Sequence, residues 1–312
     1  MPLACFYDPK LYLPLPPGHP FPMDKFPDAA KIVAETVVAL GIAEIHPITP
    51  VPESSLRLVH TRDYIDHIRN GSLSQYALNR IGLPRHPHLF RRSRYGVSGT
   101  VNAAHHAAKF QFAANLAGGT HHAFADHGHG FCVFNDVAVA IKSLQIDRPD
   151  WQFLVVDTDA HQGNGTHAIF RGDSRVFTYS IHTGKNFPAK KEPGDCDVPL
   201  SRYADSQAYF AGLKATLPEI FAQLEPDFVF WISGADVHQD DRFGQLSLTL
   251  EEIRDRDLYV LQLIADYACR AVILYGGGYN SRPGMTAEIH AQTIRVSAQF
   301  FSNLEPANSK SG

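Results

Sequence analysis

The chain has 312 residues and a formal net charge of −4, so it can bury a large core and carries no excess of basic residues. Balanced charge without a long basic run argues against a nucleic-acid-binding groove. No apolar run approaches the ~20 residues of a membrane span, and the Pro-rich N-terminus lacks the pattern of a secretory signal. The cysteines show no CxxC spacing, which favours a reduced, cytoplasmic protein, or a nuclear one in a eukaryote. The oligomeric state is left open.

Helical and strand patterns alternate along the chain. Amphipathic or Ala-rich helices are predicted at residues 28–40, 61–69, 98–112, 136–144, 204–224, 249–269 and 286–301. Short apolar strands are predicted at residues 153–156, 175–180, 228–232 and 272–275. This alternation predicts an α/β protein with βαβ units and a parallel sheet. Because no linker divides the chain, we expect one domain over residues 1–302 and a polar tail over residues 303–312.

The most informative segment follows the first of these strands. Asp157, Asp159 and His161 come at the end of an apolar, β-branched run. Side chains two residues apart lie on one face of a strand, provided that the extended geometry continues. Three ionisable groups at the end of a buried strand are costly unless they are paired or bind a metal. The segment therefore points to a functional site.

Two further strands end in similar chemistry, in residues 234–236 (Gly-Ala-Asp) and residues 276–279 (Gly-Gly-Gly-Tyr). Sites in parallel α/β sheets lie outside the carboxyl ends of the strands, so we expect these groups at one edge. Asp159, His161 and Asp236 would leave an open ligand position, as at a catalytic zinc. The alternative is that the carboxylates cap helices and the imidazole packs in the core.

Two pairs of adjacent histidines differ in context. His121 and His122 follow two glycines, where a looped segment can present a tandem acid/base pair. The other pair, at 105–106, lies inside the Ala-rich helix, and we interpret it as structural or exposed. Tyr279 follows three glycines and could donate a hydrogen bond to an oxyanion, or be a core tyrosine. The glycine run lacks both GxGxxG and GK[ST], so nucleotide binding is not indicated.

Together these motifs resemble the histone deacetylase family of the arginase/deacetylase fold, and are most similar to its class IV branch and related bacterial proteins. The motifs occur in the family's order at residues 119–122, 130–136, 157–165, 234–236 and 276–280. The resemblance implies a single domain with a roughly eight-stranded parallel sheet flanked by helices.

The resemblance also implies the roles of individual residues. A catalytic zinc would be held by three ligands, Asp159, His161 and Asp236. His122 would be the general base. His121, oriented by Asp157, would stabilise charge, and Tyr279 would polarise the scissile amide carbonyl.

A substrate tunnel and potassium sites are implied as well. Phe131 and Phe187 would sandwich the aliphatic stem of an acylated lysine, with the Gly130 carbonyl along the tunnel. One potassium site would use the backbone around Asp157, Asp159, His161 and Ser180. A second would use carbonyls of Phe170, Asp173 and Val176.

Asn164 is a departure from the family pattern, because many members carry an acidic partner of the second histidine there. A neutral amide should stabilise an imidazolium less than a carboxylate would.

We expect a zinc-dependent amidohydrolase that acts on acyl-lysine in a protein or peptide. One alternative is a hydrolase of acylated polyamines or other small acylated amines, and another is a non-catalytic, metal-stabilised binding protein. An arginase-like ureohydrolase would need a second metal and a carboxylate two residues after His161, where Gly163 stands. The sequence leaves the acyl chain length open.

Overall fold

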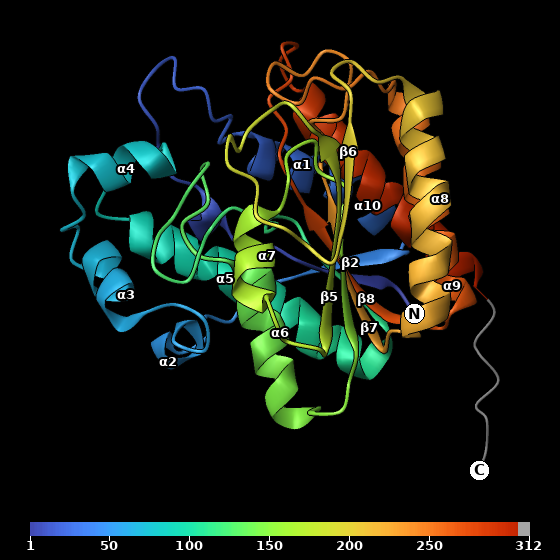
Figure 1. Cartoon of the computed structure of the whole chain (residues 1–312), viewed down its shortest axis with the longest axis horizontal. Helices are drawn as coiled ribbons and strands as arrows, with labels where there is room; N and C mark the ends of the chain where they lie inside the picture. The colour runs from blue at the N-terminus through green and yellow to red at the C-terminus, as the bar shows by residue number, and fades with distance from the viewer. Residues whose placement is uncertain (305–312) are drawn as a thin grey trace.

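Eight parallel strands form one sheet at the centre of the computed structural model, which describes residues 1–304 (Figure 1). The strands are β1 (Leu3–Phe6), β2 (Ala43–His46), β3 (Phe112–Asn115), β4 (Phe153–Asp157), β5 (Val176–Thr183), β6 (Cys196–Leu200), β7 (Phe228–Ser233) and β8 (Arg270–Tyr275). Their spatial order is β2-β1-β3-β8-β7-β4-β5-β6, and every neighbouring pair is parallel. The α/β class and the eight-stranded parallel sheet are thus confirmed.

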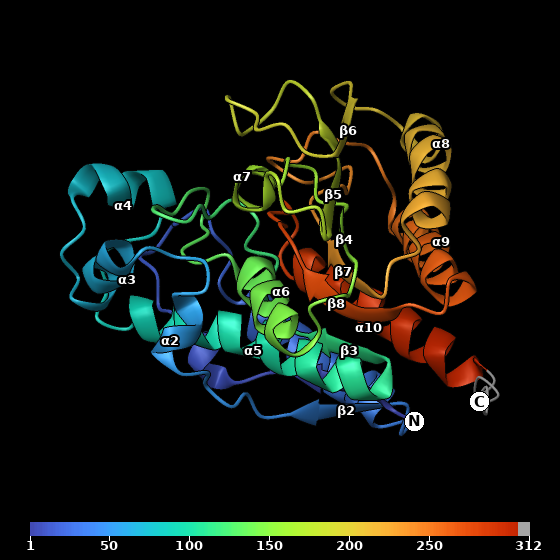
Figure 2. The ribbon, with the colours of Figure 1, turned by 60° about the horizontal axis from the view of Figure 1, so that its bottom comes forward.

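Helices cover both faces of this sheet (Figures 1 and 2). Within residues 1–304 the α-helices are α1 (Lys25–Val33), α2 (Glu53–Leu56), α3 (Arg62–Arg69), α4 (Gln75–Ile81), α5 (Leu89–Phe110), α6 (Asp136–Asp147), α7 (Asn164–Phe170), α8 (Ser206–Leu224), α9 (Leu250–Asp266) and α10 (Met285–Asn303). Helices α5, α6 and α7 lie on one face, and α8, α9 and α10 lie on the other. Helices α2, α3 and α4 lie beyond α5, away from the sheet. None of these helices is long and apolar enough to cross a membrane.

The central strands are the most apolar because helices cover them on both sides. Every residue of β4 and of β7 is buried, as expected for strands inside a parallel sheet. The flanking helices begin at the predicted caps. Asn135 accepts a hydrogen bond from the Ala138 N–H at the start of α6, and Thr249 and Glu252 form a capping box at α9.

One predicted helix has the wrong bounds. The helix expected at residues 98–112 begins nine residues earlier, at Leu89, and ends at Phe110, so that Phe112 opens strand β3 instead. Pairing with β1 and β8 overrides the helical preference of this Ala-rich segment. The expected boundary at residues 302–303 falls within the last turn of α10. Of the predicted polar tail, residues 305–312 lie outside the described part of the chain.

Strands β3, β8, β7 and β4 are consecutive in the sheet and end at the same edge. His121 and His122 follow β3, and Tyr279 follows β8. Asp236 follows β7, and Asp159 follows β4. The topology therefore brings together the strand ends that the sequence singled out.

Candidate active site

Three potential metal ligands meet beyond the carboxyl ends of β4 and β7. The ligand atoms of Asp159, His161 and Asp236 lie within 4.8 Å of one another, and all three residues are buried. His161 Nδ1 lies 3.1 Å from Asp159 Oδ1 and 2.9 Å from Asp236 Oδ2. Burial raises the pKa of Asp236 to about 7, and the negative charge of Asp159 adds to this shift. Two buried carboxylates and an imidazole form a donor set that fits a zinc ion with an open position.

The backbone turns sharply after β4. The N–H of Asp159 donates to Asp157 Oδ1 at 3.1 Å, and the N–H of His161 donates to Asp159 Oδ1 at 2.9 Å. The extended geometry therefore stops at Asp157, so the condition under which all three side chains would lie on one face is not met. These local hydrogen bonds compete with strand geometry. As a result Asp157 turns toward His121, while Asp159 and His161 turn toward Asp236.

The two adjacent histidines have different partners. His121 Nδ1 lies 2.6 Å from Asp157 Oδ2, and His122 Nδ1 lies 2.7 Å from Asn164 Oδ1. Burial opposes protonation of His121, but the charges of Asp157 and Asp159 raise its pKa to about 9. Burial holds the pKa of His122 well below its usual range, and the positive charge of His121 adds to this shift. The pair thus combines one imidazole that favours the charged form with one that favours the neutral form.

Buried backbone contacts fix the loops that carry these residues. The carboxylate of Asp136 accepts the N–H groups of Gly119 at 3.0 Å and Thr120 at 2.7 Å, immediately before His121. The N–H of Gly277 donates to Asp159 Oδ2. A Cβ at Gly277 would lie 2.1 Å from Asp236 Oδ2, so only glycine allows this approach.

Tyr279 and Lys25 lie side by side next to the metal ligands. The Tyr279 ring is buried, and Lys25 Nζ lies 5.5 Å from its centroid and 3.2 Å from the Gly276 carbonyl oxygen. Burial lowers the pKa of Lys25 to about 8, although the carboxylates of Asp236 and Asp159 oppose this shift. Sequence reasoning missed Lys25, because it is an isolated lysine far from the motifs in sequence.

An outer pocket leads to this site. Phe131, Phe187 and Tyr279 line it together with the imidazoles of His122 and His161. The Phe187 ring lies 4.9 Å from the His122 ring, and the Phe131 ring lies 5.7 Å from the Tyr279 ring. The residues expected along the substrate tunnel therefore line one pocket.

Gly130 lies close to two rings that line the outer pocket. Its φ is +51°, and a Cβ there would lie 2.7 Å from both His122 Cδ2 and Phe187 Cε1. A side chain at this position would therefore strain the backbone and push against both rings.

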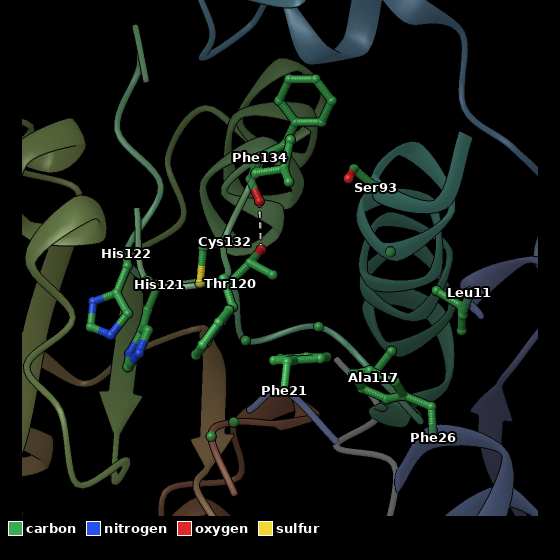
Figure 3. A pocket seen from close by; sticks show the side chains of 18 of the residues that line it. Leu11, Phe21, Phe26, Ser93, Ala117, Thr120, His121, His122, Cys132 and Phe134 are labelled. Carbon is green, nitrogen blue, oxygen red and sulfur yellow. Dashed lines mark hydrogen bonds between the residues drawn. The ribbon is translucent and has the colours of Figure 1, made fainter. Parts of the chain in front are cut away.

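An inner cavity shares His122, Phe131 and Tyr279 with the outer pocket and continues toward α1 and α5. Figure 3 shows His121 and His122 side by side on one side of this cavity and Leu11 and Ser93 on the other. The hydroxyl of Thr120 donates to the Phe134 carbonyl oxygen at 2.6 Å.

The predicted potassium ligands fall into two groups. Ser180 on β5 pairs in register with Asp157 on β4, next to Asp159 and His161. Phe170 ends α7, Val176 begins β5, and Asp173 lies in the turn between them, where the Asp173 N–H donates to the Phe170 carbonyl at 2.9 Å. The structure places each group together, and cation binding stays a prediction.

The second histidine pair has a structural role, as interpreted. His105 Nε2 lies 2.9 Å from Ser143 Oγ and joins α5 to α6. His106 packs against Phe6 and Phe110.

A buried Asp–His–Asp group beside paired histidines, at the carboxyl edge of a parallel sheet, defines an α/β protein with a candidate metal-dependent catalytic centre. Residues 19–295 match the histone deacetylase domain, and the chain belongs to this family.

Relatives of this chain include an uncharacterised protein of Picosynechococcus sp., 38% identical over 88% of this chain and 91% of that protein. The acetoin utilization protein AcuC of Staphylococcus xylosus is 32% identical over 84% of this chain and 74% of AcuC. The crystal structure of the HDA15 HD domain superimposes with a TM-score of 0.80 at 21% identity and covers 96% of this chain and 91% of that one, a likeness in fold alone. Family membership and the AcuC relatives support a deacetylase-type hydrolase that acts on amides.

Proposed function

We propose that this chain is a zinc-dependent amidohydrolase that removes an acyl group from acyl-lysine. The observation that carries the proposal is the buried group of Asp159, His161 and Asp236 beside two histidines whose pKa values shift in opposite directions. When bound, zinc would polarise the amide carbonyl and activate the attacking water.

The two histidines have different roles, and only His122 transfers protons. An amide oxygen accepts a hydrogen bond, so Asn164 Oδ1 places the proton of His122 on Nδ1 and leaves Nε2 with a lone pair. His122 would accept a proton from the attacking water at Nε2 and return it to the leaving amine. His121, held as an imidazolium by Asp157, would stabilise the negative charge that develops beside it.

Tyr279 and the aromatic walls serve binding and polarisation. The burial of Tyr279, and next the charge of Asp159, hold the pKa of its phenol well above the usual range, so the hydroxyl keeps its proton as a donor to the carbonyl oxygen. Phe131 and Phe187 would enclose the apolar stem of the lysine and exclude water.

The proposal also includes structural potassium ions and a cytoplasmic location of the protein. The backbone carbonyls near Ser180 and those between Phe170 and Val176 would hold structural potassium ions, since hard oxygen ligands suit such cations. A cytoplasmic location agrees with four cysteines that are all free.

The test is acyl release from one lysine peptide that carries acyl chains from acetyl to myristoyl. Zinc-loaded protein should release at least one of them, and Tyr279→Phe should lower kcat about 100-fold with a smaller change in KM, the effect of one lost oxyanion donor. A zinc-loaded protein that releases none of the series would refute the proposal.

A further inference from the structure

The mouth of the outer pocket is positively charged, in contrast to the chain as a whole, which carries a formal charge of −4. Three segments form this mouth: the C-terminal end of α4 with Gly82 (residues 79–82), and the loops at residues 186–187 and 242–245. Among the described residues that line the pocket, the permanently charged side chains are Arg80 and Arg242, and none is Asp or Glu.

Neither guanidinium is neutralised by a carboxylate in the described part of the chain. Arg242 is exposed, and it donates to two carbonyl oxygens, of Tyr279 and Pro20, at 3.0 Å each. Arg80 is half-exposed and packs over the Tyr76 ring at 6.0 Å. Carbonyl and ring contacts leave the positive charge in place, so both arginines present it to whatever enters the pocket.

The carboxylates nearest to Arg242 in sequence do not offset it. Asp241 turns inward and accepts the N–H groups of Phe243 and Gly244 at 2.9 Å each. Asp240 pairs with Arg282 at 3.0 Å. On the neighbouring loop, Lys185 is exposed and adds a further positive charge beside Asn186.

The charge of Arg80 also acts on His129, which packs against the pocket residue Phe187. Burial, and next the charge of Arg80, lower the pKa of His129 to about 4, and the His129 ring lies 4.6 Å from the Phe187 ring. The charge of Arg80 thus acts on a residue that packs against Phe187, which would flank the substrate stem.

We infer that this mouth selects acyl-lysine within an acidic peptide and disfavours acylated polyamines, an inference that rests on the proposed function. Carboxylates beside the acyl-lysine would pair with the guanidinium forks of Arg80 and Arg242. A polyamine keeps further ammonium groups on the same chain, and these would meet two like charges at the rim.

The experiment compares kcat/KM for one acyl group on an acyl-lysine flanked by Asp, by Ser or by Lys, and on spermidine. We expect kcat/KM to fall from the Asp peptide to the Ser peptide, the Lys peptide and then acyl-spermidine. Successive peptides should differ about fivefold, the effect of an exposed ion pair. The differences should lie in KM and shrink in 0.5 M salt, where charges are screened within roughly 4 Å.

Arg80→Glu is the diagnostic variant, because the Arg80 side chain holds none of the proposed catalytic residues, whereas Arg242 holds the Tyr279 carbonyl. It should abolish the preference between the Asp and Lys peptides, because the new carboxylate offsets the remaining charge of Arg242, and Arg80→Gln should weaken the preference. The matched control is Arg254→Glu on α9, an exposed arginine outside the pocket, which should leave the preference unchanged.

Fluorescence anisotropy with the same labelled peptides gives the preference independently of turnover. Equal affinity for the Asp and Lys peptides, a best rate on acyl-spermidine, or an unchanged preference in Arg80→Glu would overturn the inference. Charge-selective binding without turnover of any substrate would instead contradict the proposed function and leave the charge selection standing.

Discussion

His121 and His122 are neighbours in the chain, yet the side chains that hold them differ in charge. The carboxylate of Asp157 contacts His121, and the side-chain amide of Asn164 contacts His122. A carboxylate favours the imidazolium more than an amide does, which is why the two pKa values move apart. Groups whose pKa values are driven apart by their surroundings are suited to separate acid and base roles.

Replacing Asn164 by Asp would give His122 a charged partner and raise its pKa. A general base must be unprotonated, so kcat/KM rises with pH through the pKa of the base. The acidic limb of the pH–rate profile should therefore move to higher pH in Asn164→Asp. Profiles of kcat/KM for both proteins check this, and superimposable acidic limbs would show that the His122–Asn164 contact does not set the base.

At the scale of elements, helix α9 supports the end of β7 through a buried ion pair. Arg256 and Asp257 are fully buried, and Arg256 Nη2 lies 2.7 Å from Asp257 Oδ1. Arg256 Nη1 donates to the Gly234 carbonyl oxygen at 2.7 Å, two residues before Asp236. Thr293 on α10 donates to the other oxygen of Asp257 at 2.7 Å. The network joins two helices to the loop that carries a proposed metal ligand.

Arg256→Ala should lower the free energy of unfolding by about 3–5 kcal/mol, because it leaves the Asp257 carboxylate buried without its partner. Urea denaturation measures the loss. Arg254→Ala, two residues away on the same helix and more than half exposed, should change stability by less than about 0.5 kcal/mol. Equal effects of the two substitutions would contradict the structural role of the pair.

Sequence reasoning found the elements whose signal is local. Strands β4 and β7 are apolar runs bounded by polar residues, and both were predicted to within a residue or two. Strands β1, β2 and β3 have four residues each, and β3 (Phe-Ala-Ala-Asn) contains no β-branched residue. Such segments become strands only because neighbouring strands pair with them, which periodicity in a single sequence does not reveal.

The candidate site divides in the same way. Motifs next to strand ends identified the metal group and the paired histidines, since a parallel sheet brings those ends to one edge. Lys25 and Arg80 come from segments without a motif and reach the site only through the folded loops and helices around them. Their part in the site could be recognised only from the three-dimensional arrangement.

At the scale of the whole molecule, the site depends on nearly the full length of the chain. Lys25 lies near one end of the sequence and Tyr279 near the other, yet their side chains are neighbours beside the metal group. Strands β3, β8, β7 and β4 must all pair before their following loops can meet. The site is therefore complete only in the folded chain, in agreement with a family match that spans residues 19–295.

The central claim is that amide hydrolysis depends on a metal held by Asp159, His161 and Asp236. The most direct measurement is the rate of acyl release from an acyl-lysine peptide by the wild-type chain and by Asp159→Ala, each with added zinc and after chelation. We expect wild-type activity that chelation abolishes and zinc restores. Asp159→Ala should be at least about 100-fold slower than the zinc-loaded wild-type chain, with added zinc as well as after chelation. Activity retained by Asp159→Ala, or by the chelated wild-type chain, would contradict the claim.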